Sequence, residues 1–200
     1  MSLLPQTMPD HKRTLPDHLL FNHNRDHFWV FAYGSLMWRP DFDFNDRQPA
    51  TLKGYCRALC IYSWFHRGTR EIPGLIFGLD KGGHCDGFAF QIPAHAQEAT
   101  VAMLRQRELV RNVYQETLGT IELTGENPRT VQALFYTAVQ DHEQYTGPLD
   151  HEEQARLIKQ GVGKSGINTE YVLNTHDHLV REGIRDDNLT SLCKLLNDTR

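Results

Sequence analysis

The chain reads Phe28-Trp29-Val30-Phe31-Ala32-Tyr33-Gly34-Ser35 where a polar N-terminal segment gives way to an apolar one. Six consecutive apolar or aromatic residues ended by Gly-Ser are too few for a helix and favour a buried β-strand. The preceding segment is polar and carries Pro5, Pro9 and Pro16, so we expect residues 1–27 to form an N-terminal arm. We expect a single domain over residues 28–200, because domains hold roughly 150 residues.

The rest of the chain predicts strands first and helices last. Gly and Asp residues at 80–83 predict a hairpin turn between two short strands, and Asp150 is placed to cap a helix. The expected elements after the first strand are, in chain order, strands at 51–63, 74–79 and 87–92, a helix at 94–111, strands at 117–123 and 130–139, and helices at 151–160, 168–183 and 187–196. This segregated order predicts an α+β fold, and many short strands suit a small, partly closed barrel with surrounding helices.

Composition excludes several classes of protein. The chain has 200 residues, of which 40% are hydrophobic and 23% charged, with a net charge of -4. A dedicated nucleic-acid binder usually has a basic excess, so we expect no nucleic-acid partner. No stretch approaches the roughly 18 apolar residues of a membrane span, so we expect no membrane partner. The four cysteines are too few for a disulfide scaffold, which favours a cytoplasmic location.

The first candidate for chemistry is the segment Tyr33-Gly34-Ser35-Leu36, directly after the first predicted strand. A strand that ends in Gly-Ser lets consecutive backbone N–H groups converge on one point, where they bind a carboxylate or a developing oxyanion. The alternative is an ordinary turn. A nucleophile elbow is excluded, because Gly-x-Ser-x-Gly is absent.

The second candidate is Glu108, near the end of the predicted helix at 94–111. On a helical wheel Glu108 falls between Val101 and Leu104, so its carboxylate lies on an apolar stripe. Burial would raise its pKa toward neutrality, as a general acid-base group requires. The alternative is a helix-end glutamate that pairs with Arg105 or Arg111.

Metal and nucleotide sites have no support. The segment 161–166 resembles a phosphate-binding loop, but Ile158 stands where that motif needs glycine. His176 and His178 are two residues apart on a predicted helix and do not share a face. Neither a Cys-x-x-Cys pair nor His-Glu-x-x-His is present, so we expect no cofactor and no metal.

A resemblance joins these pieces. Residues 29–42, Trp-Val-Phe-Ala-Tyr-Gly-Ser-Leu-Met-Trp-Arg-Pro-Asp-Phe, resemble the opening of the ChaC-type γ-glutamylcyclotransferases, which act on glutathione. Matches that follow in the same order are His66-Arg67-Gly68, Arg107-Glu108, Tyr145-x-Gly147-Pro148 and Gly163-x-Ser165-Gly166-x-Asn168-Thr169-Glu170-Tyr171. The resemblance covers residues 28 to about 180.

The family resemblance implies a γ-glutamylcyclotransferase-like fold and a set of roles. It makes Glu108 the catalytic acid-base and lets Tyr33, Gly34, Ser35 and Leu36 bind the γ-glutamyl group. It places Tyr114 and Tyr145 near the substrate. The implied substrate is a small molecule, glutathione, with no cofactor. Two departures are Leu75-Ile76 after Pro73-Gly74, where close members have arginine, and Leu109-Val110 after Glu108, where glycines are common.

The implied reaction is a cyclisation. The α-amine of the γ-glutamyl group attacks its own γ-carbonyl, 5-oxoproline forms, and cysteinyl-glycine leaves. Arg105 or Arg107 is expected to tune the charge of the site. One alternative keeps this reaction but changes the substrate to another γ-glutamyl amine or dipeptide. Another is a non-catalytic γ-glutamyl-binding or cation-transport-regulating protein.

Overall fold

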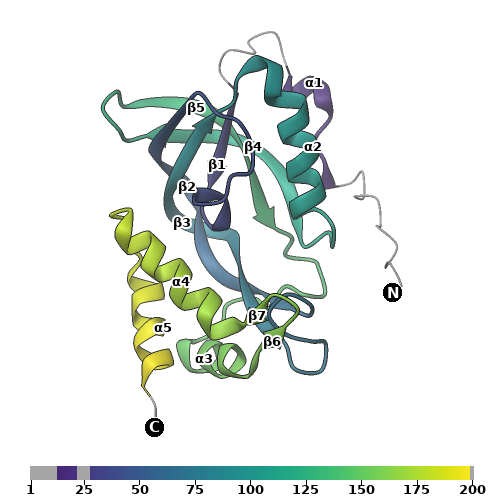
Figure 1. Cartoon of the computed structure of the whole chain (residues 1–200), viewed down its shortest axis with the longest axis vertical. Helices are drawn as coiled ribbons and strands as arrows, with labels where there is room; N and C mark the ends of the chain where they lie inside the picture. Colours follow the sequence, from purple (N-terminus) through teal and green to yellow (C-terminus); the bar gives the residue numbers. More distant parts are fainter. Residues whose placement is uncertain (1–12, 22–27, 199–200) are drawn as a thin grey trace. The chain divides into compact units, whose positions relative to one another are not determined.

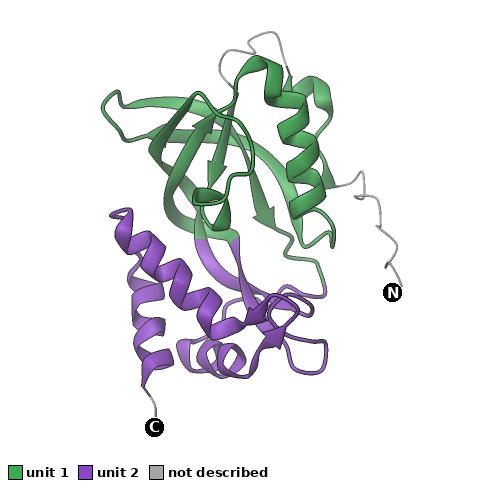
Figure 2. Ribbon diagram, in the orientation of Figure 1, with its two compact units in different colours: residues 1–56, 79–142 green, residues 57–78, 143–200 purple. Residues whose placement is uncertain are grey.

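The computed structural model describes residues 13–21 and 28–198. The chain divides into two compact units, which Figure 2 colours separately. Unit 1 comprises Met1–Cys56 and Leu79–His142, and unit 2 comprises Arg57–Gly78 and Glu143–Arg200. The expected boundary between an arm at 1–27 and a domain at 28–200 stays a prediction, and residues 1–12 and 22–27 lie outside the described part.

A closed five-stranded barrel forms the core of the fold, with strand order β1-β3-β2-β4-β5. The strands are β1 Trp29–Ala32, β2 Asp46–Ser63, β3 Gly74–Gln91, β4 Tyr114–Leu123 and β5 Arg129–Ala138 (Figure 1). The short β1 pairs antiparallel with β3 on one side and parallel with β5 on the other, which closes the sheet. The predicted α+β fold with a small barrel and surrounding helices is confirmed.

The inside of the barrel in unit 1 is filled by alternate residues of its strands. Trp29 and Phe31 of β1 pack with Ile121 of β4 and Phe135 of β5, and all four are at most 1% exposed. Because side chains alternate between the two faces of a strand, even-numbered residues of β4 and β5 point away from this core. Glu116 and Tyr136 are therefore directed toward the outside of the barrel.

The predicted hairpin at residues 80–83 is wrong. The structure has one continuous strand, β3, from Gly74 to Gln91. Gly82 and Gly83 do have positive φ angles of 110° and 63°, as turn glycines do. Pairing of β3 with its neighbours in the barrel overrides this local turn preference, and the glycines let the backbone bend within the strand.

Unit 1 also holds the helices around the candidate site. These are α1 Asp17–Leu20, the 3-10 helices η3 Ser35–Met37 and η4 Ala94–Ala96, and α2 Gln97–Glu108. The helix expected at 94–111 thus begins as a 3-10 turn and ends earlier. Leu20 of α1 is buried, although it lies in the segment expected to form an arm.

Unit 2 is built from three helices that contact one another, α3 His151–Gln160, α4 Asn168–Arg181 and α5 Asp187–Asn197 (Figure 1). The sequence predicts all three, and the Asp150 carboxylate caps α3 by accepting from the Glu153 N–H at 2.8 Å. Between α3 and α4, β6 Val162–Gly163 and β7 Gly166–Ile167 form a short hairpin. Within the described residues, no helix combines the length and apolar character needed to cross a membrane.

Candidate active site

Glu108 is the last residue of α2, and its side chain is only 19% exposed. The Leu109 N–H makes the last α-helical hydrogen bond, to the Arg105 carbonyl at 3.0 Å, and the backbone of Leu109 then leaves helical geometry with φ -96° and ψ 5°. The Leu109 side chain is fully buried. Val101 and Leu104 are buried earlier in α2. Burial disfavours the ionised carboxyl and raises the pKa of Glu108 above its ordinary value. The carboxyl that the sequence places on the apolar stripe of this helix is thus largely buried.

Arg107 is the charged partner of Glu108. Its Nε lies 3.3 Å from Oε1 of Glu108, and its positive charge offsets part of the effect of burial on the pKa of that carboxyl. The alternative from the sequence, a pairing of Glu108 with Arg105 or Arg111, is not the one found. Arg105 instead contacts Glu116 and Asp17.

The segment Tyr33–Leu36 forms a turn that leads into η3, and anion binding by its N–H groups stays a prediction. Gly34 caps η3, and the Ser35 carbonyl accepts from the N–H groups of Trp38 and Arg39 at 3.3 and 2.9 Å. The N–H groups of Ser35 and Leu36 come first in this turn, where helical backbone leaves N–H groups without an intrahelical acceptor. Nothing lies within 4 Å of the position that a Cβ at Gly34 would occupy. The turn is therefore open on the side of Gly34.

Arg107 connects this turn to Glu108. Its Nη2 donates to Ser35 Oγ at 2.9 Å, and its Nη1 donates to the Arg39 carbonyl at 2.8 Å. The same Nη1 lies 3.0 Å from Oδ2 of Asp41, which completes the pairing of the guanidinium. One side chain therefore bonds the loop after β1 and the carboxyl at the end of α2. The sequence suggested Arg107 only as a source of charge and missed Asp41, although Asp41 lies within the motif at 29–42.

The three tyrosines of the prediction lie in different places. Tyr33 is partly buried and packs against the inner core of the barrel. Tyr114 opens β4 opposite Ala138 and is 9% exposed. Tyr145 belongs to unit 2, where it forms an isolated bridge with Ile61. Of the predicted site residues, the structure joins Ser35 and Glu108 through Arg107. Roles for the three tyrosines stay predictions.

The motif residues at 163–171 hold unit 2 together. Asn168 is fully buried, and its side-chain amide accepts from the Leu75 N–H at 2.6 Å and donates to the Leu75 carbonyl at 2.8 Å. Ser165 Oγ lies 2.9 Å from Nδ1 of His66. A Cβ on Gly163 would come within 2.5 Å of the Phe65 carbonyl oxygen, so only glycine fits there. These contacts tie the loop at 65–68 to the β6-β7 hairpin.

No part of the described chain brings three or more His, Cys, Asp or Glu side chains together as a metal site. His176 Nε2 lies 3.2 Å from Oγ1 of Thr190, a contact between α4 and α5. Cys56, Cys60, Cys85 and Cys193 are all free thiols. The segment 161–166 forms the end of α3 and the β6-β7 hairpin, which differs from the strand-to-helix loop that cradles phosphates.

Comparisons with known proteins agree on one family. The sequence profile of the ChaC-like proteins matches residues 28–199. The glutathione-specific gamma-glutamylcyclotransferase of Escherichia coli K12 is 32% identical over 164 residues, which cover 82% of this chain and 70% of that protein. The human glutathione-specific gamma-glutamylcyclotransferase 1 is 31% identical over 182 residues, with coverage of 89% and 82%.

A solved structure gives the same fold. A yeast gamma-glutamyl cyclotransferase described as specific to glutathione superposes with a TM-score of 0.76 at 23% identity. The match covers 88% of this chain and 97% of the yeast chain. The barrel and helices of this chain therefore share the architecture of that yeast protein.

Proposed function

We infer the reaction of this chain from its family, because the chain belongs to the ChaC-like proteins. We propose that it is a γ-glutamylcyclotransferase that converts glutathione to 5-oxoproline and cysteinyl-glycine. Relatives in Escherichia coli, zebrafish and human carry the name glutathione-specific gamma-glutamylcyclotransferase, at 32%, 38% and 31% identity. The observation in this chain that carries the proposal is a largely buried carboxyl, Glu108, bonded through Arg107 to the loop at Ser35.

The reaction forms one C–N bond and breaks another. The α-amine of the γ-glutamyl group attacks the γ-carbonyl carbon, and the amide nitrogen of the cysteinyl-glycine part leaves with a proton. Well-oriented intramolecular attack contributes about 7–11 kcal/mol when the chain is held curled. A single group that takes a proton from the α-ammonium and returns one to the leaving nitrogen contributes about 10²–10⁴-fold.

Glu108 is the group that we assign to both proton transfers. Its raised pKa keeps the carboxylate basic enough to accept the proton of an ammonium group, and the neutral acid formed then protonates the leaving amine. Arg107 keeps the carboxylate accessible in its ionised form, because its positive charge opposes the effect of burial. The acid and base roles are thus held by one residue at different stages.

We assign the binding of substrate oxygens to the backbone N–H groups of the turn at Gly34-Ser35-Leu36. Backbone N–H groups in a fixed turn stabilise a developing oxyanion without reorganising during the reaction. Arg107 fixes the Ser35 side chain and the Arg39 carbonyl, so the turn and Glu108 are held by a common anchor. We further propose that Tyr33 and Tyr114 line the substrate site and that the protein acts in the cytoplasm, where reduced glutathione is abundant.

The test is incubation of the purified chain with glutathione and measurement of 5-oxoproline and cysteinyl-glycine. Equal amounts of the two products are expected. A panel of other γ-glutamyl amines and dipeptides separates a glutathione enzyme from a cyclotransferase with another substrate. Glutathione binding without either product would support a non-catalytic γ-glutamyl-binding or transport-regulating protein and overturn the proposal.

Arg107→Gln is expected to change the pH dependence of the reaction. Glu108 must be ionised to accept a proton, so kcat/KM falls as pH falls through its raised pKa. Loss of the neighbouring cation raises this pKa further, so the acid limb should move to higher pH. KM should rise as well, because the turn at Ser35 loses its anchor.

The measurement is a profile of kcat/KM against pH that spans the acid limb and its plateau. Arg185→Gln is the matched control, because Arg185 is 85% exposed and pairs only at the surface with Asp187. An acid limb that does not move in Arg107→Gln would remove Arg107 from the proposed machinery.

A further inference from the structure

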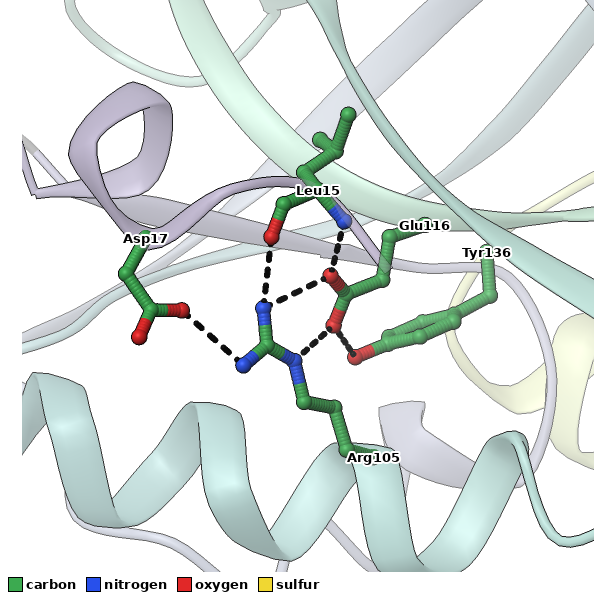
Figure 3. A network of polar contacts seen from close by, with 5 residues as sticks. All are labelled: Leu15, Asp17, Arg105, Glu116 and Tyr136. Atoms are coloured by element: carbon green, nitrogen blue, oxygen red, sulfur yellow. Dashed lines mark hydrogen bonds and ion pairs between the residues drawn. The ribbon is translucent and has the colours of Figure 1, made fainter. Parts of the chain in front are cut away.

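Unit 1 contains a second buried carboxyl that the proposed mechanism does not use. Glu116 of β4 has a side chain that is 0% exposed, and four donors surround it (Figure 3). Arg105 donates through Nε at 2.8 Å and Nη2 at 3.0 Å. The Leu15 N–H donates at 2.8 Å, and the Tyr136 hydroxyl donates at 3.2 Å.

The strand register explains why these groups meet. Glu116 lies directly opposite Tyr136 in the β4-β5 pair, and both point away from the inside of the barrel. Directly opposed residues of an antiparallel pair lie on the same face, within reach of each other. A buried carboxylate is costly unless it is paired and fully hydrogen-bonded, and Arg105 from α2 supplies the charge that Glu116 needs.

The N-terminal segment completes this network. The Leu15 carbonyl accepts from Arg105 Nη2 at 2.9 Å, while the Leu15 N–H donates to Glu116. Asp17 Oδ1 lies 3.0 Å from Arg105 Nη1. Leu15 is therefore bonded to both members of the buried pair, and Figure 3 shows the guanidinium of Arg105 between Asp17, Leu15 and Glu116. A segment expected from its sequence to be an arm supplies two backbone groups to the interior of unit 1.

The network is linked to Glu108 through the last turn of α2. Arg105 precedes Glu108 by three residues, so the two lie on neighbouring positions of the helix surface. The Arg105 carbonyl also accepts the last α-helical hydrogen bond, from the Leu109 N–H. Burial raises the pKa of the Tyr136 hydroxyl, and the charges of Glu116 and Glu108 raise it further. The charges of both carboxylates therefore act on the Tyr136 hydroxyl.

We propose that Glu116 is a positioning residue for Glu108. Glu116 acts by holding Arg105, and through Arg105 it holds the last turn of α2. Leu15 completes the set of bonds to this pair. Arg105 anchors the turn to β4, and Arg107 anchors it to the loop at Ser35, so Glu108 is held from two sides. This role rests on the proposed function, because Glu108 matters as a base only if the chain catalyses the cyclisation.

Glu116→Gln tests the proposal, with Glu122→Gln as the matched control. Glu122 lies on the same strand, but its pair with Lys53 is exposed. Loss of the anchor should lower kcat by roughly 10- to 100-fold, because small misplacement of a reacting group has effects of that size. KM should stay within about twofold, since Glu116 does not touch substrate, and Glu122→Gln should resemble the unchanged chain.

The pH profile separates positioning from a general loss of folded protein. Glu108 pairs with Arg107 of α2, and Arg107 pairs in turn with Asp41. The hydroxyl of Tyr136 of β5 lies within the influence of Glu108, Glu116 and Arg105, so it connects Glu108 to the buried pair. Glu116→Gln removes a negative charge and leaves Arg105 paired only with Asp17 among the carboxylates, which should move the acid limb of kcat/KM to lower pH. Arg105→Gln leaves Glu116 negative, which should move the limb to higher pH. Acid limbs of Glu116→Gln and Arg105→Gln that do not move in opposite directions would contradict the proposal.

A second variant and a second measurement keep the test independent of folding and of activity. Arg105→Lys retains the positive charge but cannot bond Glu116, Leu15 and Asp17 together, so it should also lower kcat with KM unchanged. Hydrogen exchange of the Leu109 amide reports the last turn of α2 directly and should accelerate in Glu116→Gln and Arg105→Lys. Unaltered exchange overturns the positioning role, whereas absence of turnover in the unchanged chain overturns only the proposed function.

Discussion

Glu108→Gln is expected to reduce the release of 5-oxoproline from glutathione by about 10²–10⁴-fold, which is the usual contribution of a general acid-base group. Glutamine keeps the shape of the side chain and its place beside Arg107, but it neither accepts nor returns a proton. The loss corresponds to about 3–5 kcal/mol of transition-state stabilisation. It should appear in kcat, and KM should change little, because the amide still fills the same position.

The control for this variant is Glu98→Gln. Glu98 lies in the first turn of the same helix and is exposed, so its replacement should leave the rate unchanged. Product is measured by mass spectrometry at several enzyme concentrations, so that contamination by another peptidase is recognised. A Glu108→Gln protein that forms 5-oxoproline at the rate of the unchanged chain would show that another group moves the proton.

Loss of activity in Glu108→Gln should not come from loss of the fold. The pKa of Glu108 is raised in the folded chain, so folding favours its protonated form. Stability from that form is fully present below the unfolded pKa and is lost as pH rises through the folded pKa. Above its folded pKa the ionised Glu108 is therefore a net cost to stability. A neutral amide should leave the midpoint of thermal unfolding equal or higher.

Local patterns predicted the parts of unit 1 that depend on local chemistry. The apolar run that ends at Gly34 specifies β1, because so short a run of apolar and aromatic residues is typical of a buried strand. The spacing of Val101, Leu104 and Glu108 along α2 predicts that the Glu108 carboxyl faces the interior, as it does. Both inferences need only side-chain periodicity, which the chain displays directly.

The prediction that failed and the feature that the sequence did not reveal both depend on contacts between residues far apart in the sequence. Gly82 and Gly83 carry the mark of a turn, yet the barrel keeps β3 extended through them. Glu116 lies on the outer face of β4 and would normally be expected to contact water. Its burial comes from Arg105 and from Leu15, which is 101 residues away in the chain. No short window of sequence contains that information.

Motif residues also proved to have different kinds of role, which the resemblance alone does not separate. Arg107 and Ser35 bond each other beside Glu108, and that contact supports the role in the reaction that we propose for them. Asn168 and Gly163 instead join backbone segments within unit 2. A motif residue that only holds two loops together should affect stability more than the chemical step, and this difference is measurable.

Asn168→Ala is accordingly expected to destabilise the chain by about 2–5 kcal/mol. The Asn168 side chain is fully buried, and its amide makes both an accepting and a donating bond to the backbone of Leu75, at 2.6 and 2.8 Å. Alanine would leave the Leu75 N–H and carbonyl without this partner, and each buried polar group left unsatisfied costs about 1–3 kcal/mol. The measurement is the free energy of unfolding from urea titration followed by circular dichroism.

Asn188→Ala is the matched control, because Asn188 also lies in the first turn of a unit 2 helix, α5, but is exposed. Its replacement should change the free energy of unfolding by less than about 0.5 kcal/mol, as surface substitutions do. At a temperature where Asn168→Ala remains folded, its kcat should stay within about threefold of the unchanged chain. A kcat loss of 100-fold with unaltered stability would instead make Asn168 part of the reacting site, because a residue that only ties Leu75 to α4 acts through the folded population.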